Sequence, residues 1–129
     1  MAQPPLLCYR GAQPGMTANT NMIVRTWHAA ATSAGARQYH HYFATTLLPE
    51  LRKLPGFVGG YLLSRELDSA VELTTHTIWE SLAAIRAFAG EDITNSVVEP
   101  EAQSVLLNFD RTATHRSVLV GTTLCLEDG

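Results

Sequence analysis

A predicted β-hairpin in the middle of the sequence constrains the fold of this chain most. Residues 57–65 and 71–79 are rich in β-branched and aromatic side chains, and the turn-forming segment 66–69 separates them. Two consecutive glycines, Gly59 and Gly60, interrupt the first of these strands and are typical of a β-bulge or of a close backbone approach. The hairpin predicts an antiparallel sheet, and the flanking segments decide what covers it.

The segments that precede the hairpin predict one strand and one long helix. Residues 22–29 consist mostly of β-formers. Ser33 can cap a helix from about residue 34 to residue 54, within which Pro49 predicts a kink or a break. One side of this helix carries, at helical spacing, Tyr39, Phe43, Thr46, Leu47, Leu51 and Leu54.

The segments that follow the hairpin predict two more helices and a last strand. Ser81 can cap a helix over residues 82–89 that ends at Gly90. Pro100 suits the first turn of a third helix, and residues 112–120 are rich in β-formers. The apolar side of that third helix would consist of Ala102, Val105, Leu106 and Phe109.

The order of these elements is that of a ferredoxin-like split βαβ fold. In this α+β arrangement, one antiparallel four-stranded sheet carries its helices on one face. We expect Arg25, His76 and Ile78 on the opposite, uncovered face. A second copy of the chain would bury that face, so the sequence predicts a homodimer.

The length and charge of the chain restrict its class further. Its 129 residues suit one domain, which we place at residues 22–120 between an irregular arm over residues 1–21 and a tail over residues 121–129. A net charge of −3, with only nine lysines and arginines, leaves no basic patch for a nucleic-acid backbone. No apolar run approaches the roughly 20 residues that span a bilayer. We therefore expect neither nucleic acid nor a membrane as a partner.

Two cysteines, Cys8 and Cys125, lie near opposite ends of the chain. A disulfide that ties the two ends together remains open, but two free thiols in a reducing cytoplasm fit the other features better. No cysteine or histidine spacing is typical of zinc, and a trio of His28, His40 and His115 has no spacing to support it. We expect no metal and no other cofactor.

Two stretches of the sequence carry a family resemblance. They are Leu-Pro-Gly-Phe-Val-Gly-Gly-Tyr at residues 54–61 and Thr-Ile-Trp-Glu-Ser-Leu-Ala-Ala-Ile-Arg-Ala-Phe-Ala-Gly-Glu-Asp at residues 77–92. The chain resembles the antibiotic biosynthesis monooxygenase family over roughly residues 22–120. The resemblance implies the dimeric α+β barrel fold. It also implies a range of activities: some members oxygenate aromatic polyketide anthrones without metal or cofactor, others oxidise quinols, and others degrade haem.

The functional positions of the anthrone-oxygenating branch are only partly kept in this sequence. The tryptophan at the end of the third strand corresponds to Trp79, whereas the branch's asparagine and tyrosine fall on Thr75 and Ile85. Its histidine on the second strand falls on Leu63. The resemblance therefore implies a pocket between the sheet and the helices, but that branch's mechanism does not transfer as a whole.

The haem-degrading branch gives a second set of positions. Its asparagine late in the first strand falls near His28, and its axial histidine falls near Val98. Because valine provides no ligand, the resemblance does not imply ordinary haem ligation here.

The alternation of a β-strand adds candidates to the implied pocket. If Trp79 and Thr75 line it, Thr77 lies on the same face. Tyr61 in the strand 57–65 and His28 at the end of the strand 22–29 are expected to face it as well. The substrate-binding surface would also include Tyr39, His40 and Phe88.

Each main candidate has a chemical and a structural interpretation. His28 could remove a phenolic or activated C–H proton as a general base, or it could be a half-exposed histidine at a strand end. Trp79 could stack on an aromatic substrate, or it could pack in the core. Tyr61 could hydrogen-bond a substrate oxygen or form a cross-strand pair. Thr75 and Thr77 could orient a ligand or reflect ordinary β-propensity.

These observations support two hypotheses of function. The first is a cofactor-independent oxygenase of a small electron-rich aromatic or quinol-type substrate, with His28 as the base, or His76 if the strand faces are reversed. The second is a non-catalytic dimer of the same fold that binds a small ligand or has a structural role. Haem binding is a third, weaker hypothesis.

Overall fold

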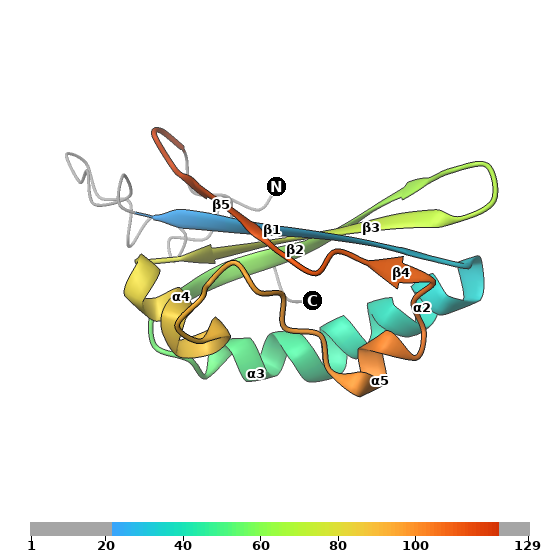
Figure 1. Ribbon diagram of the computed structural model, residues 1–129, viewed down its shortest axis with the longest axis horizontal. Helices are drawn as coiled ribbons and strands as arrows, with labels where there is room; N and C mark the ends of the chain where they lie inside the picture. The colour runs from blue at the N-terminus through green and yellow to red at the C-terminus, as the bar shows by residue number, and fades with distance from the viewer. Residues whose placement is uncertain (1–21, 122–129) are drawn as a thin grey trace, which may run out of the picture.

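The computed structural model describes residues 22–121 and consists of one antiparallel sheet with helices on one face (Figure 1). Two long strands, β1 (Ile23–Ala31) and β3 (Val71–Trp79), lie side by side in the middle. Strand β2 (Phe57–Glu66) pairs with β3 at one edge. The short strands β4 (Asn108–Phe109) and β5 (Thr114–Ser117) both pair with β1 at the other edge. The predicted α+β fold class is confirmed, although the fourth strand is split into two.

The β-hairpin forms as predicted, with a bulge at its start. The register between β2 and β3 shifts between Phe57 and Gly59. Gly60 follows the bulge, and a Cβ atom there would lie 3.3 Å from the carbonyl oxygen of His76. Gly60 thus allows the close approach of β2 to β3, whereas a Cβ atom at Gly59 would have no neighbour within 4 Å.

The long helix is divided into three segments around its proline. Helix α2 (Ser33–Tyr42) passes into a π-helical segment η2 (Phe43–Leu47) and then into α3 (Leu48–Arg52). Pro49 has no backbone N–H to continue the α-helical pattern, and the preceding N–H, that of Leu48, donates to the carbonyl of Phe43 five residues back. The predicted irregularity at Pro49 is confirmed. The cap is Thr32 rather than Ser33, because the Thr32 hydroxyl accepts from Gly35 N at 2.9 Å.

The second half of the chain agrees less closely with the sequence pattern. Helix α4 (Leu82–Ala89) has the predicted bounds, with Ser81 as its cap and Gly90 at φ 96° as its end. Helix α5 is only Pro100–Gln103. The predicted continuation to Phe109 is wrong, because the chain turns into the sheet: the N–H of Leu107 donates to the Ala30 carbonyl at 2.8 Å.

The core lies between the helices and one face of the sheet, which we call the inner face. Trp27 packs there against Tyr39, with ring centroids 6.1 Å apart. Trp79, which is 0% exposed, packs against Phe57 and Phe88 with centroid distances of 5.2 and 5.4 Å. The inner-face residues of the two central strands are Ile23, Arg25, Trp27, Ala29 and Ala31 in β1 and Val71, Leu73, Thr75, Thr77 and Trp79 in β3.

No helix of residues 22–121 lies over the opposite, outer face (Figure 1). His76 and Ile78 lie on this face, as predicted. The prediction for β1 is wrong in direction: Arg25 lies on the inner face at 5% exposure, and His28 lies on the outer face beside Thr74. The physical reason is that Trp27 and Thr75 are paired across the two strands, and directly paired residues share a face.

Several predictions fall on residues that the structure does not describe. These are the arm over residues 1–21, most of the tail over residues 121–129, and both cysteines, Cys8 and Cys125.

Candidate functional site

A small hollow lies between the inner face and the helices, and we call it the inner cavity. Its volume is about 40 Å³, which is the space of a few water-sized groups. The sheet, α2, η2, α3, α4 and the segment 96–97 all contribute to its wall. The lining residues are Arg25, Trp27, Tyr39, Phe43, Leu47, Leu51, Thr75, Thr77, Phe88, Ser96 and Val97.

A larger depression, the side groove, adjoins the inner cavity. Its volume is about 540 Å³, within the range of pockets that hold small organic ligands. The two hollows share four lining residues, Leu47, Leu51, Phe88 and Val97, so these side chains form the boundary between them. A ring system has room in the side groove, whereas only a substituent fits into the inner cavity.

Arg25 is the most unusual residue of the inner cavity. Its Nη1 donates to the Ile93 carbonyl at 2.5 Å and lies 3.0 Å from His115 Nε2, while its Nη2 donates to the Asn95 carbonyl at 2.8 Å. Its Cζ lies 5.6 Å from the centroid of the Phe88 ring. Within residues 22–121 no carboxylate forms an ion pair with this guanidinium. Burial lowers the pKa of Arg25, but a guanidinium stays charged in proteins.

The contact with Arg25 fixes the protonation of His115, which faces it from β5. A guanidinium only donates, so His115 Nε2 must accept and the ring proton lies on Nδ1. Burial and, to a smaller degree, the charge of Arg25 lower the pKa of His115. The pair therefore carries one positive charge, located on Arg25.

Two hydroxyl groups reach the free space of the inner cavity. Tyr39 is 3% exposed and Thr75 is 8% exposed, and neither hydroxyl has a hydrogen-bond partner within the described chain. No polar side-chain atom among residues 22–121 is both fully buried and unpartnered, so these hydroxyls contact accessible space. Burial, and next the proximity of Tyr42, raises the pKa of Tyr39, which keeps its phenol protonated and able to donate.

The structure brings four of the predicted site residues together. Thr75, Thr77, Tyr39 and Phe88 all line the inner cavity. Trp79 lies directly beside them without lining it, and its Nε1 donates to the Thr77 hydroxyl at 2.9 Å.

The other predicted site residues lie elsewhere. His28 is exposed on the outer face, where its Nδ1 lies 3.0 Å from the Thr74 hydroxyl. Tyr61 pairs with His76 on the outer face, and with His40 it lines a separate depression along the free edge of β2. The predicted placement of His28 in the sheet–helix pocket is therefore wrong, because β1 presents the opposite set of residues to the helices. Tyr61 lies outside the inner cavity, but the depression that it lines is also lined by Phe43 and Leu48 of the helices.

Sequence reasoning missed Arg25 and His115 as parts of the site. The signal was present in β1: Ile23, Trp27 and Ala29 alternate with more polar neighbours, and Arg25 occupies the same parity. Arg25 is nevertheless predicted from the sequence on the uncovered face, together with His76 and Ile78. The contact with His115 depends on pairing between strands 90 residues apart and had no local signal.

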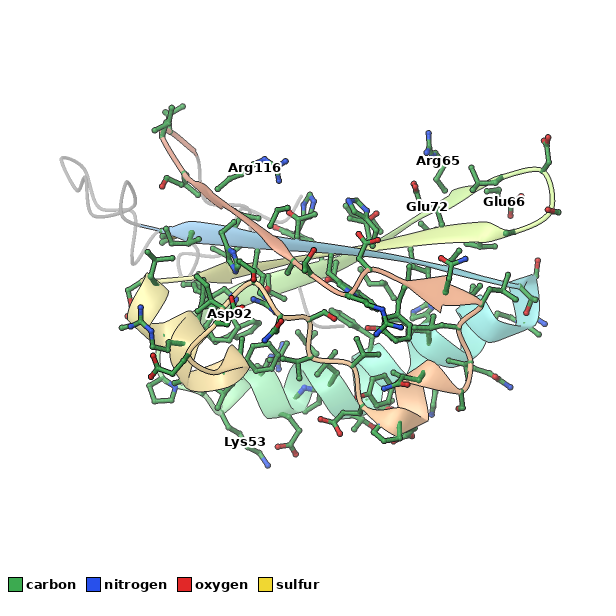
Figure 2. The ribbon with its side chains drawn as sticks, viewed as in Figure 1. Lys53, Arg65, Glu66, Glu72, Asp92 and Arg116 are labelled. Atoms are coloured by element: carbon green, nitrogen blue, oxygen red, sulfur yellow. The ribbon has the colours of Figure 1, made fainter. Side chains whose placement is uncertain are left out.

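The charged side chains labelled in Figure 2 lie at the periphery of the molecule, whereas Arg25 is buried. Arg65 pairs with Glu72 at 3.1 Å on the outer face, and Lys53 pairs with Glu50 at 3.3 Å beyond α3. In both pairs the cation is exposed to solvent and its partner is a carboxylate. Arg25 thus stands out as a buried cation that is held by neutral groups.

The described residues contain neither a metal-binding cluster nor a membrane-spanning helix. Residues 22–121 contain no group of three His, Cys, Asp or Glu side chains arranged to hold a metal ion. None of the helices in this part of the chain has the length and hydropathy needed to cross a membrane.

Comparison with known proteins gives structural but no sequence-level relatives. No protein-family model matches the chain, and neither does any curated protein. A structure from Bacillus cereus, named as an antibiotic biosynthesis monooxygenase, is 16% identical with a TM-score of 0.56, covering 81% of this chain and 99% of its own.

Two other structures that are similar to this chain have more specific names. SnoaB, a cofactor-independent oxygenase from Streptomyces nogalater, is 23% identical over 81% of this chain and 97% of its own, with a TM-score of 0.50. The haem degrader MhuD from Mycobacterium tuberculosis, solved with two haems in its active site, is 21% identical over 78% of this chain and 98% of its own, with a TM-score of 0.51. These likenesses confirm the α+β fold of the single chain that the sequence resemblance implied, and the dimer stays a prediction.

Proposed function

We propose that this protein is an oxygenase of a small electron-rich aromatic or quinol-type substrate. The ring of the substrate would lie in the side groove and one of its oxygen substituents would enter the inner cavity. The observation that carries the proposal is the lining of that cavity, where aromatic walls surround one buried cation and two free hydroxyls. The structural likeness to a cofactor-independent oxygenase supports the same class of reaction.

In such a reaction the substrate itself supplies the electrons. For an anthrone, the CH₂ group between the two aromatic rings becomes a carbonyl, one atom of O₂ enters the product, and the other leaves as water together with both hydrogens. Ionisation of the substrate raises its electron density before it meets O₂. The contribution of the protein is to exclude water and to stabilise the developing oxyanion with Arg25, Tyr39 and Thr75.

The residues present do not fit a haem. Within the described chain, the linings of the side groove and the inner cavity hold no histidine, cysteine or methionine that could act as an axial ligand. They do hold Tyr39 and Tyr42, but burial raises the pKa of both phenols, which disfavours the phenolate that would bind iron. Glu50, Glu99 and Glu101 line the side groove and would repel haem propionates. We therefore derive no haem chemistry for this chain, although MhuD has a similar fold.

Oxygen uptake by the purified, metal-stripped protein tests the proposal directly. The panel consists of 1,8-dihydroxyanthrone, unsubstituted anthrone and two hydroquinones, each corrected for autoxidation. We expect uptake above background that a chelator does not remove. Val97→Trp, which fills the boundary between the groove and the cavity, should abolish it.

A matched substitution serves as the control. Val97 and Val58 are 39% and 45% exposed, and Val58 lies on β2, outside both linings. Val58→Trp should keep wild-type uptake. Absence of uptake with every compound, together with binding of any of them, would contradict the oxygenase and support a non-catalytic ligand-binding protein.

We also propose that the outer face forms a homodimer in a reducing cytoplasm. None of the helices in the part of the chain that the structure describes lies over this face, which carries the partly exposed side chains of Tyr61, His76 and Ile78. A second copy would bury these groups. Sedimentation equilibrium should show a dimer that Ile78→Asp dissociates, whereas a monomeric wild-type protein at micromolar concentration would contradict the proposal.

A further inference from the structure

We infer that the inner cavity binds the ionised oxygen of a phenol or enol whose remaining part is neutral, with Arg25 as the charge partner. This inference rests on the proposed function and names the class of substrate for the same site. It follows from the charge inside the cavity, the donors that remain free there, and the opposite charge at the groove.

The first step is the uncompensated charge of Arg25. A buried cation is normally paired with an anion, since removing a charge from water is costly. The residue Arg25 is 5% exposed, and the partners of its guanidinium are two carbonyls and a neutral imidazole. The described residues provide no anion for Arg25, and a ligand with one negative charge would provide it.

The second step is that Arg25 keeps donors for such a ligand. A guanidinium has five N–H groups, and the contacts with Ile93, Asn95 and His115 engage three of them. Its Nε–H has no partner in residues 22–121. Since no side-chain nitrogen there is both fully buried and unpartnered, this atom reaches accessible space.

The third step is the set of groups that face this cation from the surrounding elements. Strand β5 contributes the neutral His115, α2 contributes the protonated Tyr39, α4 contributes the ring of Phe88, and β3 contributes the hydroxyl of Thr75. None of these groups is negative. The hydroxyls of Tyr39 and Thr75 can donate to the same oxygen as Arg25, which favours an anionic acceptor.

The fourth step is the charge of the side groove, which has the opposite sign. Glu50, Glu99 and Glu101 line it. Their effect is visible at Tyr42, whose pKa is raised by burial and then by the charges of Glu99 and Glu101. A carboxylate would be repelled as it enters, whereas a phenol enters neutral and ionises inside, releasing its proton to bulk water.

The size of the inner cavity restricts where the ligand can carry its negative charge. About 40 Å³ admits a single oxygen substituent, so the negative charge must lie at the inner end of the ligand. The body of the ligand lies in the acidic groove and must be uncharged. A phenol or enol meets both conditions.

A chromogenic phenol tests the inference. 4-Nitrophenol absorbs at different wavelengths in its neutral and ionised forms, so a pH titration with saturating protein gives the pKa of the bound probe. We expect the wild-type protein to lower that pKa by at least about one unit, which is a tenfold preference for the phenolate. Arg25→Gln should remove the shift, and Arg25→Lys should retain part of it.

A matched arginine provides the control. Arg116 lies on β5 next to His115, but it is exposed and its Nη1 donates to Thr114. Arg116→Gln should leave the shift unchanged. Circular dichroism and urea unfolding of each variant establish that it is folded, and Arg25→Lys keeps the test valid if Arg25→Gln does not fold.

A second probe separates phenols from carboxylic acids. 4-Nitrobenzoate has the same ring and nitro group but is ionised throughout this pH range. We expect it to associate at least about tenfold more slowly than 4-nitrophenol in stopped-flow measurements, and Glu99→Gln combined with Glu101→Gln should reduce the difference. Equal association rates of the two probes with the wild-type protein would overturn the assignment to phenols.

The outcomes distinguish the inference from the proposed function. If 4-nitrophenol binds with an unchanged or raised pKa, or if Arg25→Gln behaves as wild type, the inference is wrong and the oxygenase can still stand. If the pKa is lowered through Arg25 but no substrate consumes oxygen, the phenolate site stands and the oxygenase is wrong.

Discussion

The two faces of strand β1 place their polar residues against expectation. Arg25, a residue type that is almost always exposed, lies on the inner face at 5% exposure. His28, three residues later, lies exposed on the outer face and contacts Thr74. Arg25 is thus buried between the sheet and the helices while His28 is exposed, which is the reverse of what residue type alone predicts.

The difference between the two faces lies in the backbone that surrounds them. Above Arg25 the segment 93–95 presents two carbonyl oxygens that accept from the guanidinium. Among the described residues nothing comparable covers His28, where the neighbouring elements are other strands of the same sheet. A strand decides which residues share a face, but the loop packed against that face decides which polar residues it can accept.

The largest contrast between the faces should come from truncating their apolar residues. Trp79→Ala removes a 0% exposed side chain that packs against Phe57 and Phe88, so we expect the free energy of unfolding to fall by about 3–5 kcal/mol. Leu63→Ala on the outer face, where the side chain is 44% exposed in the single chain, should cost less than about 1 kcal/mol when both substitutions are compared in the monomeric Ile78→Asp background. Urea unfolding measures both, and similar losses would show that the outer face is as well packed as the core.

The next largest effect should come from Arg25 itself. Arg25→Met keeps an unbranched side chain but leaves the Ile93 and Asn95 carbonyls without their donor, so we expect a loss of about 1–3 kcal/mol. Arg116→Met on the exposed strand β5 should change stability by no more than about 0.5 kcal/mol. A stabilised Arg25→Met protein would contradict the hydrogen-bonding role assigned to these carbonyls.

A smaller effect should appear in the pH dependence of stability. The pKa of His115 is lowered by burial and by Arg25, so below its ordinary value of about 6.5 the unfolded chain takes up a proton that the folded chain does not. Stability should therefore decrease as the pH falls through and below about 6.5. In His115→Gln, which keeps an acceptor for Arg25, that part of the decrease should disappear.

The control for this experiment is a histidine on the exposed side of α2. His41→Gln removes one imidazole far from Arg25 and should leave the acid-side decrease in place. Urea midpoints between pH 5 and pH 8 give the comparison. Identical pH profiles for wild type and His115→Gln would show that the contact between Arg25 and His115 does not control the protonation of the ring.

The smallest effect is expected at His28. Because His28 is exposed on the outer face, His28→Ala should change the free energy of unfolding by no more than about 0.5 kcal/mol and should leave oxygen uptake unchanged. A loss of uptake in this variant would return the general base to the outer face and contradict the site described above. This measurement therefore separates the two faces most directly in function.

The elements of the fold could largely be predicted because their signals are local. Ser81 and Gly90 gave both ends of α4, and the turn at residues 66–69 gave the hairpin. Pro49 marked the irregular part of the long helix. The failure at α5 was also physical: the apolar spacing up to Phe109 fits a helix, but pairing with β1 provided the competing hydrogen bonds.

The candidate site could be predicted only in part. Thr75 and Thr77 follow from the position of Trp79, because alternate residues of one strand share a face. Arg25 and His115 do not follow, since their contact requires the register between β1 and β5. The lining of the side groove by Glu99 and Glu101 depends in turn on where α5 packs.

The sequence by itself determined the order of strands and helices, the fold class and the set of residues that share each strand face, since caps, turns and periodicity are properties of neighbouring residues. The tertiary structure alone decided which face of β1 meets the helices, and with it the burial of Arg25 and the exposure of His28. That choice depends on strand pairing and on two backbone carbonyls about 70 residues away, whose positions no local pattern records.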